Sequence, residues 1–292
     1  MAGMLSIASR EFSDMVRSKR FLVLIVIFTL VMIIPIVQIY AQAYQGWWLP
    51  TRFLGMMAYM LTGTFTAFAP IIGVALGCDA ISGEREKGTL KIIMAQPIYR
   101  DTVINGKFIA ATSAVSLAIL VTSLGIVGLS TILLGVTPTV AETLRIGLYF
   151  AFSILFTMTF YGLAALISTI IKKTSLGVIL SIGMWGVFAF VIPMIASLIA
   201  MTITVRGGAY ESDGYMRGYT AIFETIYSLS PNYHFSKIGE HLVGTYATWD
   251  SVEATSIMSS LMYAGPSILV LAIVTTLFFI ASYITFTRQE IR

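Results

Sequence analysis

Long hydrophobic runs alternate with short polar stretches along the whole chain. Six runs are long enough to cross a membrane, because a helix needs about 20 apolar residues to span a hydrocarbon core of about 30 Å. They lie near residues 21–41, 56–77, 107–135, 145–171, 175–203 and 264–287. None alternates as barrel strands do, and a helix satisfies its own backbone hydrogen bonds in lipid. The pattern predicts an all-α polytopic membrane protein, a single domain over residues 1–292 with six transmembrane helices.

Composition agrees with this membrane assignment. Hydrophobic residues make up 57% of the 292 residues and charged residues 11%, against about 45–50% and about 25% in soluble domains. We expect no cleavable signal, because the N-terminus is long and charged and the first apolar run exceeds a signal core. The single cysteine, Cys78, can form neither an internal disulfide nor a metal site alone. The net charge of +4 indicates membrane orientation rather than nucleic-acid binding.

Basic residues concentrate on one side of the predicted membrane. Of the 18 basic residues, 13 share one side: Arg10, Arg17, Lys19, Arg20, Arg85, Lys87, Lys91, Arg100, Lys107, Lys172, Lys173, Arg288 and Arg292. The other side holds Arg52, Arg145, Arg206, Arg217 and Lys237. Cytoplasmic loops carry the excess of Lys and Arg. Both termini of this cell-membrane protein are therefore predicted to be cytoplasmic, with residues 204–263 outside.

Two segments outside the spans show helical periodicity. Residues 4–20 predict an amphipathic helix in the interface, with Leu5, Ala8, Phe12, Met15 and Val16 on its apolar side. The segment acts either as a simple anchor or as part of a partner's grip. The 204–263 loop contains apolar stripes on both sides of Ser230-Pro231-Asn232, which predict short helices resting at the outer surface.

The stretch 78–106 is the main polar loop on the inner side. A helix there would place Ile81, Thr89 and Ile92 beneath and Glu84, Lys87 and Lys91 outward, and would end at Gln96-Pro97. Gly83-Glu-Arg-Glu-Lys-Gly88-Thr89 has the glycine spacing of a phosphate-binding loop but lacks its lysine after the second glycine. We therefore predict a helical hairpin that docks a soluble partner and binds no nucleotide itself.

The spans offer no chemistry that would drive transport or catalysis. We expect no Asp, Glu, His or Arg inside them as a proton or sodium relay, and no catalytic set falls at membrane level. Gly73 and Gly77 have a small-xxx-small spacing, which we assign to packing within one subunit. Energy is therefore expected to arrive from another polypeptide through the 78–106 loop.

The motif from Ala80 to Pro97, with Arg100 and Gly106-Lys107-Phe108, resembles the signature of six-helix ABC exporter permeases of the type-two class. It is most similar to the permeases of nitrous-oxide reductase maturation systems. Ala8–Asp14 and Ser230-Pro231-Asn232 also resemble that family, so the resemblance spans most of the chain.

The resemblance implies a permease subunit, without enzymatic activity of its own, in an exporter. Two cytoplasmic ATPase subunits would carry the ATP and Mg, so this chain has no cofactor, and the second permease copy would form a homodimer or be a similar chain. Residues 4–20 would be the elbow helix and 78–106 the coupling-helix hairpin. The implied ATPase contacts are Ser82, Gly83, Glu84, Arg85, Glu86, Lys87, Lys172 and Lys173. Substrate identity and substrate-binding residues do not carry over.

Three alternatives remain open at this point. The chain can be a membrane sensor or assembly scaffold that docks a soluble partner through residues 80–100 without transport. Met56, Met57, Met60, Met258 and Met262 near the outer face suit Cu(I), although methionines in an apolar chain usually pack. His234, Glu240 and His241 suggest a metal site, but their spacing is not the i, i+4 histidine pair of zinc helices.

Overall fold

The computed structural model describes residues 2–44, 53–89, 99–206, 212–244, 252 and 254–288, and over these ranges it contains helices and no strand. Six helical segments are long and apolar enough to cross a membrane. They are Lys19–Ala41, Gly63–Glu86, Arg100–Leu134, Val140–Ile170, Thr174–Val205 and Ile257–Arg288. The predicted all-α fold with six spans is confirmed.

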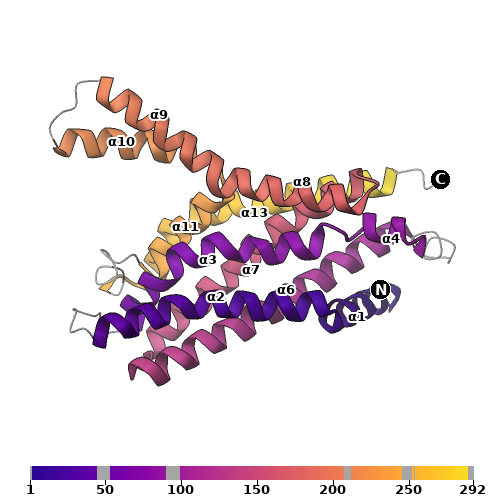
Figure 1. Cartoon of the computed structure of the whole chain (residues 1–292), viewed down its shortest axis with the longest axis horizontal. Coiled ribbons are helices and arrows are strands. Elements are labelled where there is room, and N and C mark those ends of the chain that lie inside the picture. Colours follow the sequence, from indigo (N-terminus) through magenta and orange to yellow (C-terminus); the bar gives the residue numbers. More distant parts are fainter. Residues whose placement is uncertain are drawn as a thin grey trace.

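Seven helices build the spans: α2 (Lys19–Tyr44), α3 (Phe53–Gly77), α6 (Arg100–Leu134), α7 (Val140–Ile170), α8 (Thr174–Gly186), α9 (Ile192–Arg206) and α13 (Ile257–Arg288). The fifth span consists of α8 and α9, joined without a break by a π-helical turn at Val187–Val191. In Figure 1, α9 leaves the bundle, and α10 (Ser212–Tyr227) runs back along α9.

The bundle has two distinct ends. One end, called the α4 end below, holds α1 (Ala2–Arg17), α4 (Ser82–Glu86) and both chain termini (Figure 1). The opposite end, called the α11 end, holds α11 (Pro231–Leu242). The two termini therefore lie on the same side, as an even number of spans requires.

α3 and α7 approach each other closely in the core. A Cβ added at Gly73 would lie 2.2 Å from the carbonyl oxygen of Thr157, and one at Gly77 would lie 2.7 Å from that of Tyr161. No side chain fits at either position, because real Cβ atoms do not approach so closely. The prediction that Gly73 and Gly77 serve packing within one subunit is confirmed.

The amphipathic helix expected near the N-terminus is α1, and its apolar side packs on the bundle. α1 lies along α6, with Ile7 and Phe12 packed against the core and Leu5 exposed. A Cβ at Gly106 of α6 would come within 2.8 Å of Ile7 Cγ2, so this glycine lets α1 lie close. Ser18 ends α1 through its bond to the Met15 carbonyl and accepts the amide of Phe21.

α11 differs from the expectation of a helix resting at the surface. Ser230 caps it and Pro231 occupies its first turn, as the Ser-Pro-Asn break predicts. Its apolar face, however, is inserted between α3, α7 and α13. Phe235 is fully buried and stacks on Phe156, with ring centroids 4.3 Å apart. The expectation was wrong for α11 because its stripe faces helices rather than lipid.

Two charged side chains hold the α11 end together. Glu142 completes a capping box with Thr139 and also accepts the Leu54 amide of α3 at 2.8 Å. Arg145, 3% exposed, donates to the Leu242 carbonyl at 3.3 Å and to Ser260 Oγ at 3.0 Å. α7 is thereby tied to α3, α11 and α13 at this end.

We predict that Gly73→Ala lowers the free energy of unfolding of the detergent-solubilised protein by about 1–3 kcal/mol, because the added methyl group must push α3 away from α7. Gly63→Ala in the same helix is the control, since nothing lies within 4 Å of its Cβ position. Thermal unfolding followed by intrinsic fluorescence measures both. Equal melting temperatures for the two variants would show that the α3–α7 approach is not tight.

Candidate functional site

α4 is fixed to α7 through one serine. The amides of Ile81 and Ser82 donate to Ser168 Oγ at 3.1 and 3.0 Å. The hydroxyls of Ser82 and Ser168 also lie 3.0 Å apart, and both side chains are fully buried. A buried polar group that loses its hydrogen bond costs about 1–3 kcal/mol. Separation of α4 from Ser168 is therefore unfavourable, and the start of α4 is expected to move together with α7.

Two further bonds join α4 to the residues on either side of the turn between α7 and α8. Arg85 Nη2 donates to the Thr169 carbonyl at 3.3 Å. Glu86 Oε2 accepts the backbone amide of Thr174 at 3.2 Å. The 172–173 turn and α4 thus form one continuous surface, although Lys172 lies 85 positions after Lys87 in the sequence.

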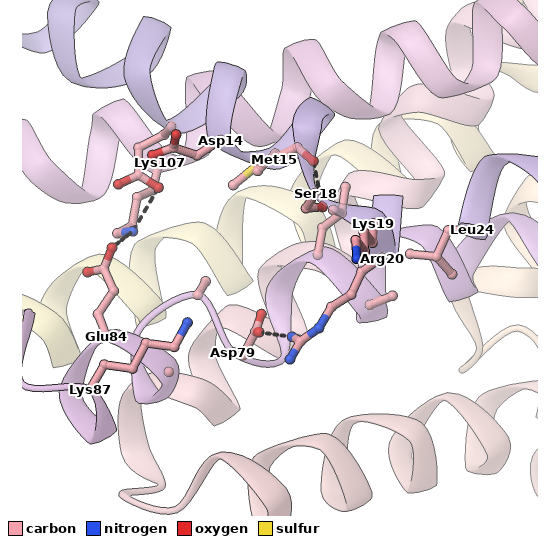
Figure 2. Close-up of a pocket in the computed structure, with 15 residues that line it drawn as sticks. Asp14, Met15, Ser18, Lys19, Arg20, Leu24, Asp79, Glu84, Lys87 and Lys107 are labelled. Carbon is pink, nitrogen blue, oxygen red and sulfur yellow. Dashed lines mark hydrogen bonds and ion pairs between the residues drawn. The ribbon is translucent and has the colours of Figure 1, made fainter. Parts of the chain in front are cut away.

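A buried ammonium group ties three elements together beneath this surface. Lys107 of α6, whose side chain is 3% exposed, contacts Glu84 of α4 at 2.6 Å and Glu11 of α1 at 3.0 Å. Figure 2 shows the Lys107 ammonium beside the Glu84 carboxylate. We call Glu11, Glu84 and Lys107 the Lys107 latch. A charge so deeply buried is tolerated only when it is paired, so the latch holds α1, α4 and α6 in one arrangement.

The residues expected to contact an ATPase divide into two groups. Glu86, Lys87, Lys172 and Lys173 are exposed, and Gly83 and Arg85 are half-buried. Ser82 and Glu84 face inward, into the Ser168 bonds and the Lys107 latch. The expectation that Glu84 points outward beside Lys87 is therefore corrected, because Lys107 provides an internal partner for it.

The first helix of the hairpin, which was expected to continue to Gln96-Pro97, is also interrupted. α4 ends at Glu86, and Gly88 adopts a left-handed backbone with φ of +74°. Thr89, expected on the apolar face, is exposed. Lys91, Ile92 and Gln96-Pro97, where the helix was expected to end, lie outside the described residues.

Metal binding finds no support in the part of the chain that is described, which contains no group of three or more His, Cys, Asp or Glu side chains able to hold a metal. His234 is bonded to the Ser228 carbonyl at 2.9 Å, and burial lowers its pKa. His241 stacks on Tyr263. Met258 and Met262 are exposed, while the side chains of Met56, Met57 and Met60 lie outside the described residues.

Sequence reasoning missed three buried charged residues. Lys107, Glu142 and Arg145 stand at the boundaries of predicted spans, where they were assigned to the water side, yet each is 3% exposed. A usable signal existed for Glu142, because Thr139-x-x-Glu142 is a capping-box pattern. No local signal identifies the partners of Lys107, since Glu11 is 96 residues away.

These features define a membrane-embedded helical protein with a charged surface, held in place by internal hydrogen bonds and ion pairs, at the end that holds both termini. The chain belongs to the ABC-2 family of transporter proteins: the family described as "ABC-2 family transporter protein" matches residues 5–291. It is accordingly a multi-pass membrane protein of a transporter family.

Two curated relatives carry the same printed name, probable ABC transporter permease protein NosY. The protein from Pseudomonas aeruginosa is 29% identical over 150 residues, which cover 50% of this chain and 53% of the relative. The protein from Stutzerimonas stutzeri is 27% identical over 217 residues, 69% of this chain and 71% of the relative. The first match thus spans about half of the relative's length.

We predict that Lys107→Met destabilises the protein by about 3 kcal/mol, near the lower limit for breaking a buried ion pair, because it leaves Glu11 and Glu84 unpaired. The double variant Lys107→Met with Glu84→Gln should recover part of that loss, as expected for groups in contact. Thermal unfolding of the wild type, the two single variants Lys107→Met and Glu84→Gln, and the double variant gives a complete double-mutant cycle. Lys87→Met, which removes an exposed lysine of the same loop, is the control. Additive effects of Lys107→Met and Glu84→Gln would contradict the latch.

Proposed function

We propose that the chain is the permease of an ABC exporter and that a separate cytoplasmic ATPase, present in two copies, drives it through the surface formed by α4 and the 172–173 turn. The observation that carries the proposal is the joining of these two segments into one charged surface by the bonds of Arg85 and Glu86. ATP and Mg would be held by the ATPase.

The orientation follows from the position of this surface. It lies at the end of the bundle that holds both termini (Figure 1), and 13 of the 18 basic residues were assigned to that side. The positive-inside rule makes this end cytoplasmic. The docking surface then faces the compartment that supplies ATP.

Exposed and inward residues of the same loop have separate roles in this proposal. Glu86, Lys87, Lys172 and Lys173 are free to meet the ATPase, whereas Ser82 and Glu84 connect α4 to α7, α1 and α6. A displacement of α4 by the ATPase would therefore act directly on α7 and α6, and on α1 through Lys107. Such transmission requires packed elements with defined contacts, which these bonds provide.

A second copy of the chain would pack on the fifth span. Only 6% of its most apolar stretch is buried within the chain, the lowest share among the six candidate spans. Gly183 and Gly186 of α8 have no neighbour within 4 Å of their Cβ positions, and small residues allow close helix approach in lipid. We therefore propose a homodimer formed through α8 and α9.

We predict that Lys172→Glu combined with Lys173→Glu lowers ATPase binding by about tenfold or more, equal to about 1.4 kcal/mol, because the pair reverses half of the exposed docking charges. The measurement is the amount of ATPase retained on the tagged permease, together with permease-stimulated ATP hydrolysis. Melting temperature of the permease should not change.

Arg217→Glu at the far side of the molecule is the matched control, because it reverses an exposed charge on α10. Unchanged ATPase retention in the Lys172 and Lys173 variant would refute docking through this turn. A copurifying partner without a nucleotide-binding motif would favour the scaffold function instead.

We predict that Ile182→Cys in a Cys78→Ser background forms a disulfide-linked dimer in oxidised membranes, because Ile182 lies exposed on α8 beside Gly183. Ile273→Cys on α13, at a position of similar exposure, is the control. Gel electrophoresis without reducing agent measures the linked fraction. Equal linkage at both positions, or none at residue 182, would argue against α8 as the interface.

A further inference from the structure

A cavity of about 480 Å³ lies at the α4 end between α1, α4, α6, the start of α2 and the end of α3. Figure 2 shows its charged lining, including the paired Arg20 and Asp79 and the Lys107 ammonium bonded to Glu84. The cavity is bounded by the Lys107 latch but extends beyond it to Asp14, Lys19 and Leu24. The proposed transport function uses none of these three residues.

The lining has an apolar part and a charged part, as expected for a cavity at the membrane interface. Met15, Leu24 and Leu76 supply apolar surface. Lys19 and Arg20 stand at the first turn of α2, the membrane-crossing helix that begins there. A residue pair at this level meets the headgroup layer of the inner leaflet, where basic side chains contact lipid phosphates. The cavity therefore suits a molecule with a charged head and an apolar body.

Charge balance in the cavity favours a zwitterion over an anion. Four carboxylates line it: Glu11 and Glu84, which pair with Lys107, Asp79, which pairs with Arg20, and Asp14, which lies 3.9 Å from Arg10. Four cations also line it, those of Lys19, Arg20, Lys87 and Lys107. A purely anionic headgroup would gain from the cations and be repelled by the carboxylates, whereas a headgroup with both charges can meet both sets.

The kind of cationic group follows from what lines the cavity. Quaternary ammonium groups are recognised by aromatic cages, and no aromatic residue is among the described residues that line this cavity. Carboxylates instead suit a primary ammonium, which has three N–H donors. We propose that this cavity binds the headgroup of a phospholipid with a primary amine, of the phosphatidylethanolamine class.

In this arrangement the lipid phosphate meets Lys19 and Arg20, and the ammonium meets Asp14 and Asp79. The acyl chains continue along the outer side of α2, where Val23, Val26 and Ile27 are 53–56% exposed. The bound lipid would thus contact the elbow helix, the first span and the end of the second span at once. The proposal does not depend on docking of an ATPase.

A series of lipids that differ only in their amine tests this proposal. Purified full-length protein in detergent is titrated with dioleoyl phosphatidylethanolamine, its N-methyl and N,N-dimethyl derivatives, dioleoyl phosphatidylcholine and dioleoyl phosphatidylglycerol. Native mass spectrometry gives the bound fraction. We expect an apparent Kd for phosphatidylethanolamine at least fivefold below that for phosphatidylcholine, with affinity falling stepwise as N–H donors are replaced.

Two variants test which residues contact the phosphate and which contact the ammonium of the headgroup. Lys19→Ala should weaken binding of every lipid in the series about equally, because it removes a phosphate contact. Asp14→Asn should reduce the preference for phosphatidylethanolamine over phosphatidylcholine. Arg17→Ala, which removes an exposed cation of α1 that does not line the cavity, should change neither quantity.

Any of four results would overturn the proposal. They are equal affinities for phosphatidylethanolamine and phosphatidylcholine, tighter binding of phosphatidylglycerol, wild-type affinities in Lys19→Ala, and wild-type selectivity in Asp14→Asn. Glycerophosphoethanolamine, which lacks acyl chains, is a further arm. Competition by this soluble headgroup at concentrations equal to the lipid would show that the cavity takes a water-soluble ligand, and the lipid proposal would fail.

Discussion

The buried ammonium of Lys107 constrains the whole α4 end. A cation at 3% exposure carries a desolvation cost of several kcal/mol that only close, well-directed carboxylates offset. Glu11 and Glu84 supply them from two different elements. If α1 or α4 moved away, the buried ammonium of Lys107 would lose one of its two carboxylate partners. The elbow helix, the α4 segment and the start of α6 therefore keep one relative position.

This constraint matters because the other contacts of α4 lead into the centre of the bundle. Ser168 holds the first turn of α4 against α7, and α7 is in turn packed on α3 at Gly73, where no side chain can intervene. At the far end, Arg145 joins α7 to α11 and α13. Dense packing of this kind moves between discrete arrangements rather than deforming smoothly. A movement imposed at α4 therefore reaches the α11 end through one helix, α7.

Sequence patterns predicted the elements better than their contacts. The six spans, the Ser-Pro-Asn start of α11 and the packing role of Gly73 follow from hydrophobic length, capping chemistry and glycine spacing, which are local properties. The inward direction of Glu84 does not, because it depends on Lys107, 23 residues away in the chain. The insertion of α11 likewise depends on its contact with Phe156 of α7. An apolar stripe in the sequence does not show whether another helix or lipid covers it. Partners distant in sequence decided what the local pattern left open.

The inward direction of Glu84 changes how the loop has to be interpreted. A run of charged residues such as Gly83-Glu-Arg-Glu-Lys87 suggests a uniform contact surface, but a five-residue helix turns each side chain to a different side. Glu84 meets Lys107, Arg85 meets the Thr169 carbonyl, and Lys87 is exposed. Charge reversal at Glu84 would therefore disturb the internal structure before it disturbed docking. Under the proposed function, docking and transmission would be separable in this loop, because neighbouring residues would perform them on opposite sides of α4.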